Sequence, residues 1–232
     1  CVEPGKSIGV PVADLNSILC VHPARDENYT RWSEAIAAFK LNEIMKTDQA
    51  RLFTCKNADE FKKELSYHCV LRTETITYTE LTTKEKQKDY KLTLVAPLAI
   101  ENLLGVAMEY VLYDKPTQNA AKMQVLKGSL KRGEKLYVYT ANLKYSIMMR
   151  VTLPGKVWQP NKLAVLHSNR NPPDPLTTNL AIYDNENNSL NLILEYSLVV
   201  GVAHREVMVF VPYWLINRTG KNLIISEHVN KI

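Results

Sequence analysis

The stretch VFVPYWLINRTGKNLII, residues 209–225, and the earlier stretch YKLTLVAPLAIENLLG, residues 90–105, decide how this chain is organised. Both are apolar runs that carry a proline, an asparagine and a glycine at the same spacing. At an offset of 115 residues, Pro97, Asn102 and Gly105 align with Pro212, Asn217 and Gly220. Similarity at a fixed offset is the sequence signature of a repeated structural unit.

Two further features recur at similar offsets, with the first copy of each before residue 90 and the second copy between the two blocks. PGKSIGVPVADL, residues 4–15, aligns with RGEKLYVYTANL, residues 132–143, at an offset of 128. Trp32 has a counterpart in Trp158 at an offset of 126. Because three features recur in the same order, we expect two copies of one module, divided as residues 1–117 and 118–232.

The modules are expected to be all-β, as tandem antiparallel β-sandwich repeats. Short runs rich in Val, Ile, Leu, Thr and Tyr are bounded by Gly, Pro, Asn and Asp, which is typical of a sandwich. The expected strands fall at 7–12, 68–79, 91–100, 109–113, 135–141, 146–153, 162–167, 179–184, 190–202 and 207–216. The charge run at 82–91 predicts an exposed loop.

One segment carries two opposed signals. In RWSEAIAAFKLNEIMK, residues 31–46, the apolar residues follow helical spacing, and the composition favours a helix. The repeat aligns Trp32 with Trp158, whose neighbour Pro160 opposes a helix. We prefer a strand here and keep the helix as the alternative.

Composition excludes several classes of protein. The chain has 232 residues, of which 46% are hydrophobic, so it can form an ordinary globular core. Its net charge of +5 is scattered along the chain, whereas a nucleic-acid-binding protein gathers basic residues in a patch. No apolar run is long enough to span a membrane, and no signal peptide is recognisable. The chain begins at Cys1, so we expect it to be part of a longer protein.

No motif in the sequence indicates catalysis. The five histidines are isolated, and the 8 glycines form no phosphate-binding loop. The four cysteines lack the close pairs of a zinc site, so we expect free thiols. The sequence therefore predicts a protein that is not an enzyme and holds no cofactor or metal. Without a secretory signal, Asn217-Arg218-Thr219 is not expected to be a glycosylation site.

The two repeated asparagines are the candidate functional residues. An asparagine at the end of an apolar run can bind the backbone of a turn through its amide group. Such an asparagine either holds a turn or contacts a ligand, and the sequence leaves both roles open.

Several strings together resemble the adaptor-binding repeat region of the vacuolar protein sorting 13 family. They are APLAIENLL at 96–104, VPYWLINRTGKNL at 211–223, VEPGKSIGVPV at 2–12, RWSEAI at 31–36 and LNLILEY at 190–196. The string PYWLINRTG is the most specific of them. The first copy has Leu98-Ala99 where the second has Tyr213-Trp214, so it matches through its proline, asparagine and glycine alone.

The resemblance implies an interaction module. Members of this family are very large lipid-transfer bridges at membrane contact sites, and this region recruits them to particular organelles. Each repeat carries a marker asparagine that matches Asn102 or Asn217 here, and adaptors present Pro-x-Pro motifs. The expected ligand is an extended peptide on a sheet edge, with Asn102, Asn217, Tyr213 and Trp214 binding it or shaping its groove.

The resemblance also implies where the protein works. Its partners would be the adaptors and the rest of the parent chain, with no nucleic acid. Its location would be cytoplasmic and peripheral, and its membrane association indirect. Two alternatives remain: architectural repeats without adaptor contact, or a module that binds acidic lipids.

Overall fold

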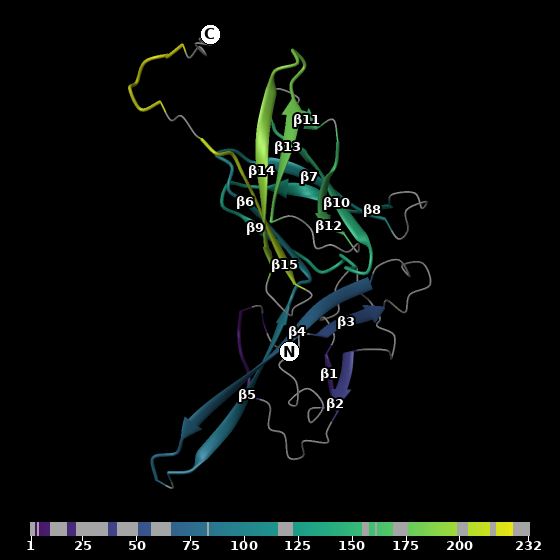
Figure 1. Ribbon diagram of the computed structural model, residues 1–232, viewed down its shortest axis with the longest axis vertical. Helices are drawn as coiled ribbons and strands as arrows, with labels where there is room; N and C mark the ends of the chain where they lie inside the picture. The colour runs from purple at the N-terminus through teal and green to yellow at the C-terminus, as the bar shows by residue number, and fades with distance from the viewer. Residues whose placement is uncertain are drawn as a thin grey trace.

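The computed structural model describes residues 3, 5–9, 18–21, 37–40, 51–56, 66–82, 84–115, 123–154, 158–160, 162–168, 176–198, 204–213 and 217–224 (Figure 1). The described residues form strands and turns and contain no helix, so the all-β prediction is confirmed. Accordingly, no described helix is long and apolar enough to span a bilayer. The strands are β1 (Ile18–Val21), β2 (Ala37–Lys40), β3 (Arg51–Lys56), β4 (Ser66–Thr79), β5 (Lys86–Val95), β6 (Leu98–Asn102), β7 (Met108–Lys115), β8 (Met123–Leu130), β9 (Lys135–Val138), β10 (Ser146–Thr152), β11 (Gln159–Pro160), β12 (Ala164–His167), β13 (Thr177–Tyr183), β14 (Ser189–Leu198) and β15 (Arg205–Phe210).

Strands β6 to β15 form one β-sandwich. One sheet has the order β11-β13-β14-β15-β6-β9 and the other β12-β10-β7-β8. Neighbouring strands are antiparallel except β15 and β6, which run parallel. Every second residue of β15 is buried, as is typical of a strand with one face on a core. Apolar side chains from both sheets share one core, and burying each contributes about 1.5–3 kcal/mol.

Strands β1 to β5 repeat part of this pattern. β1 pairs with β2 as β10 pairs with β12, and β3-β4-β5 repeats the order β13-β14-β15. β1 begins at Ile18 and β10 at Ser146, a separation of 128 residues. The predicted division at residue 117 stays a prediction; β7 and β8, which lie on either side of it, pair with one another.

Three expectations about individual segments can be compared with the strands. Ala37–Lys40 is a strand, as preferred for the segment 31–46, although Trp32 lies outside the described residues. The exposed loop expected at 82–91 is wrong from Lys86 onward, because β5 begins there. The strand expected at 207–216 ends at Phe210. The buried residues Cys55 and Cys69 are thiols, as predicted.

The long hairpin of β4 and β5 explains the wrong loop prediction. It projects as a two-stranded ribbon away from the sandwich (Figure 1). The described side chains of β5 from Lys86 to Lys91 are exposed, so no apolar alternation marks the start of this strand.

Candidate functional site

Asn102 lies at the end of β6, inside the protein. Its side chain has an exposed fraction of 0%. The amide Nδ2 donates to the carbonyl oxygens of Val106 at 2.9 Å, Leu130 at 2.9 Å and Lys131 at 3.1 Å. Its Oδ1 accepts from the backbone N–H of Leu104 at 3.0 Å. Every polar atom of the side chain is thereby satisfied, as a buried amide requires.

These bonds fix the turn that leads into β9. The backbone of Asn102 also donates to the Glu134 carbonyl at 3.0 Å and accepts from the Gly133 N–H at 2.7 Å. Gly133 has a φ of +73°, which suits glycine in a tight turn. Asn102 therefore sets the position of β9, the outermost strand of the six-stranded sheet.

Asn217 makes the same local bonds on the surface. Its Nδ2 donates to the carbonyl of Lys221, four residues on, as Asn102 does to Val106. Its Oδ1 accepts from the N–H of Thr219, two residues on, as that of Asn102 does from Leu104. The Thr219 hydroxyl also donates to this Oδ1, at 2.7 Å. The repeated block in the sequence is therefore also a repeated turn.

The other predicted residues of the second block are exposed or lie outside the described residues. The side chain of Tyr213 is 90% exposed, whereas its counterpart Leu98 is 0% exposed. Pro212 is exposed and Pro97 is buried. Trp214 lies outside the described residues. In Figure 1 the C-terminal block leaves the sandwich beyond the end of β15.

The remaining predicted structural residues lie in two different settings. Trp158 forms a bridge with Leu153 and packs against the sandwich core. Gly105 and Gly220 are exposed in their turns, and Gly220 has a φ of +69°. These positions are consistent with structural roles, while the groove-shaping or peptide-binding role of the asparagines stays a prediction.

The edge of β9 has backbone groups that face away from β6. Because Asn102 N donates to Glu134 O, the alternation of an antiparallel pair directs the backbone of Leu136 toward β6 and that of Lys135 and Tyr137 outward. The side chain of Tyr137 is 54% exposed. This edge accordingly presents hydrogen-bonding groups beside an aromatic ring.

Strand β4 already uses the next position along this edge. The N–H of His68 donates to the carbonyl of Tyr139 at 2.7 Å. The rings of Tyr67 and Tyr139 stack with centroids 4.8 Å apart. Burial lowers the pKa of His68 to about 4, with a smaller contribution from the charge of Lys144. A buried, neutral imidazole thus lies where the N-terminal strands meet the sandwich.

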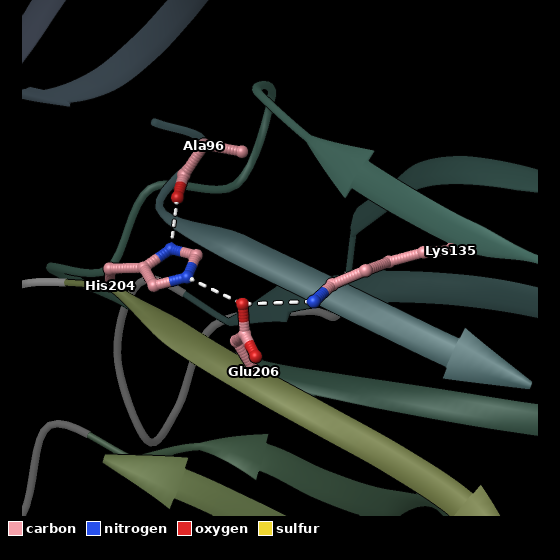
Figure 2. Close-up of polar contacts among 4 residues, drawn as sticks. All are labelled: Ala96, Lys135, His204 and Glu206. Carbon is pink, nitrogen blue, oxygen red and sulfur yellow. Dashed lines mark hydrogen bonds and ion pairs between the residues drawn. The ribbon is translucent and has the colours of Figure 1, made fainter. Parts of the chain in front are cut away.

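A polar cluster lies beside β9 on the same sheet (Figure 2). The Lys135 Nζ is 2.9 Å from the Glu206 Oε1, which is also 3.3 Å from the His204 Nε2. His204 Nδ1 forms a short hydrogen bond with the Ala96 carbonyl. The hydrogen bond from Lys135 is the main reason that the pKa of Glu206 is lowered. Burial alone would lower the pKa of Lys135, but the hydrogen bond and charge of Glu206 raise it.

Sequence reasoning missed the residues of this edge. Lys135 and Tyr137 belong to the run 135–141, which was expected as a strand, and Glu206 lies directly before the expected strand 207–216; nothing in these runs shows which strand lies at an edge. The alternation in KLYVYT does place Tyr137 on a solvent face, which is the one usable signal. Within the described residues, no group of three or more His, Cys, Asp or Glu side chains is arranged to hold a metal ion.

Comparison with known proteins shows which family this chain belongs to. Residues 1–232 match the family described as "Vacuolar-sorting associated protein 13, adaptor binding domain". A curated relative, "Intermembrane lipid transfer protein VPS13" from Chaetomium thermophilum, is 26% identical over 138 residues. This match covers 59% of the chain and 4% of that much longer protein. The resemblance seen in the sequence is confirmed, and the chain belongs to the adaptor-binding domain family of vacuolar-sorting associated protein 13.

Proposed function

We propose that this chain binds Pro-x-Pro motifs of organelle-specific adaptors, and so recruits a lipid-transfer protein to membrane contact sites. The family match over the full chain supports adaptor binding as its general role. The observation that carries the finer proposal is the outward-facing edge of β9, which already accepts a backbone hydrogen bond from β4 at Tyr139.

An extended peptide suits this edge. Main-chain pairing supplies affinity and side-chain pockets supply specificity when a peptide adds to a sheet. Lys135 and Tyr137 each direct a backbone N–H and C=O outward, in line with the bond between Tyr139 and His68. The peptide would therefore continue the edge that β4 begins.

Proline at alternate positions matches such pairing. Proline has no N–H, so in Pro-x-Pro only the middle residue can donate to the edge, while both prolines keep the peptide extended. The exposed ring of Tyr137 offers an apolar surface for one proline. The Nζ atom of Lys135 lies 5.9 Å from the centre of this ring. On this proposal, Asn102 shapes the site by holding the turn that begins β9.

Isothermal titration of the chain with a Pro-x-Pro peptide tests the proposal. Replacing both prolines by alanine, or N-methylating the middle residue, should abolish measurable binding. Tyr137→Ala should weaken binding about tenfold, the effect of losing roughly 1.4 kcal/mol of aromatic contact. Tyr213→Ala is the matched control, because Tyr213 is exposed but lies beyond β15. Undiminished affinity for the alanine peptide would reject the proposal.

The architectural alternative has its own support in the burial of Asn102 and predicts a different result. If these repeats only space other parts of the parent chain, no Pro-x-Pro peptide binds even when thermal unfolding shows an intact fold. If Tyr213→Ala weakens binding and Tyr137→Ala does not, the peptide binds at the C-terminal block instead of at β9.

A further inference from the structure

The edge of β9 is open at one end and closed at the other. Lys135 and Tyr137 direct their backbone groups outward, away from β6. The next outward position is taken, because the N–H of His68 donates to the Tyr139 carbonyl at 2.7 Å. A peptide that pairs with this edge therefore stops at Tyr137 on the side of β4. Its other end passes the turn that connects β8 to β9.

A peptide that places its prolines beside Tyr137 must run parallel to β9. In a parallel pair, a residue level with Leu136 donates to the Lys135 carbonyl and accepts from the Tyr137 N–H. With this residue as the middle of Pro-x-Pro, both prolines lie on the face of Lys135 and Tyr137, and neither needs an N–H. In an antiparallel pair the middle residue lies opposite Lys135 or Tyr137, which turns both prolines to the other face of the sheet. The parallel direction therefore brings a proline to the Tyr137 ring.

The turn between β8 and β9 is basic and exposed. It holds Lys131 and Arg132, whose side chains are exposed. Within the described part of the chain, neither side chain forms a hydrogen bond or an ion pair. The carboxylate of Glu134, the acid within this turn, accepts from the backbone N–H of Lys131 at 2.8 Å. Two cationic side chains are thus free to bind an anionic partner beside the open end of the edge.

The repeat shows that the turn does not need these two charges. At the offset of 128 residues, Lys131-Arg132 aligns with Glu3-Pro4. The first copy closes its turn with an N–H to C=O bond of 3.0 Å, where the second has 3.1 Å. The third position is a glycine in both copies, with a φ of +74° in the first and +73° at Gly133. The basic pair therefore belongs to this copy of the turn and not to the requirements of its backbone.

We propose that the adaptor peptide lies parallel to β9 and carries acidic residues directly before its first proline, where Lys131 and Arg132 bind them. This inference rests on the proposed function and adds the direction of the peptide and the charge that selects it. With the first proline level with Lys135, the two preceding residues lie level with Glu134 and Gly133, beside the basic pair in the turn. Exposed ion pairs each contribute little binding energy, so the pair selects among Pro-x-Pro sequences more than it adds affinity.

Two peptides of equal composition test the proposal by isothermal titration. One carries Asp-Asp before Pro-x-Pro and Asn-Asn after it, and the other carries these two pairs exchanged. The first should bind about fivefold more tightly at low salt, and about 0.5 M NaCl should remove the difference because it screens exposed charges. Equal affinities at low salt would overturn this inference and leave the proposed function standing. If neither peptide binds, the proposed function fails and this inference falls with it.

Two charge-reversal variants show where the acidic residues bind. Arg132→Glu should remove the preference for the first peptide, whereas Lys144→Glu should keep it. Lys144 is the matched control, because it is an exposed lysine whose charge contributes to the lowered pKa of His68, at the closed end of the edge. Thermal unfolding shows that each variant is folded. Loss of the preference in Lys144→Glu but not in Arg132→Glu would indicate an antiparallel peptide and contradict the proposal.

A nitroxide spin label on the peptide reports its direction independently of charge. At the N-terminus of the first peptide, the label should broaden the amide signals of Lys131 and Arg132. At the C-terminus, it should broaden those of Tyr139 and His68. Broadening in the reverse order would overturn the parallel direction.

Discussion

Asn102→Asp is the substitution that most directly tests the role of the marker asparagine. Aspartate keeps the acceptor for the Leu104 N–H but replaces the NH₂ group, which faces the carbonyls of Val106, Leu130 and Lys131. Two donor hydrogens are lost, and an oxygen then faces three carbonyl oxygens. Each buried acceptor left without its partner costs about 1–3 kcal/mol.

We expect the variant to lose about 3–5 kcal/mol of unfolding free energy, which for a chain of this length lowers Tm by about 10 °C. The matched control is Asn217→Asp. Within the described part of the chain the Asn217 amide donates to one carbonyl, that of Lys221, at an exposed position, so the loss should stay below about 1 kcal/mol. Thermal and urea unfolding, followed by circular dichroism, measure both.

The pH dependence of the Asn102→Asp variant is a second test of the role of the buried amide. Burial raises the pKa of a carboxyl group, and a protonated aspartate regains one donor. The stability gap between Asn102→Asp and the parent chain should therefore narrow as the pH falls, whereas the gap for Asn217→Asp should not change. Similar losses for the two variants at neutral pH would refute the view that only Asn102 is a buried staple.

Three further predictions concern packing and charge. Gly128→Ala on β8 should lose about 1–3 kcal/mol in urea unfolding, because the added Cβ would lie 2.7 Å from the Tyr110 hydroxyl; an unchanged midpoint would show that the ring moves freely. The lowered pKa of His68 means that the unfolded chain binds more protons between pH 6.5 and 4, so stability should fall by roughly 3 kcal/mol as the pH drops through this window. His68→Gln should flatten that part of the stability profile, and an unchanged slope would exclude His68 as its source. Glu206→Gln breaks the ion pair with Lys135 and should cost about 0.5–1 kcal/mol of unfolding free energy at neutral pH. The difference in stability between the parent chain and the variant should vanish as acid protonates Glu206 through its lowered pKa. A difference that persists in acid would contradict a stabilising ion pair.

The sequence predicts best the strands with one buried face. β10 and β15 alternate buried and less buried residues, because one face packs on the core, and both were expected. β8 was missed because MQVLKGSL carries a glycine that weakens the strand signal. The space beside Gly128 is taken by the ring of Tyr110 from β7, a contact that a local reading of residues 123–130 does not contain.

The marker asparagines show the limit of sequence reasoning about the site. Asn102 and Asn217 stand in the same motif and make the same bonds to residues two and four positions on. Only Asn102 also binds Leu130 and Lys131, which lie 28 and 29 residues away. Local sequence determines the turn, and distant partners determine its burial. Tyr137 likewise lies at a sheet edge because β9 is the last strand in the order of its sheet, and local sequence does not determine that order.

A proline follows the strand before each of the two blocks, and the hairpins before these prolines differ in length. Ala96-Pro97 separates β5, in the three-stranded sheet, from β6, in the sandwich. Val211-Pro212 follows β15 in the same way. A proline at this step removes one backbone donor and fixes φ, so neither strand runs on as one continuous element. The hairpin of β4 and β5 spans residues 66–95 and that of β14 and β15 residues 189–210, so the offset falls from 123 where these hairpins begin to 115 where they end. The described strands therefore keep their order while a hairpin between them varies in length, which is how a tandem β-repeat can diverge in sequence and still form the same turn at each marker asparagine.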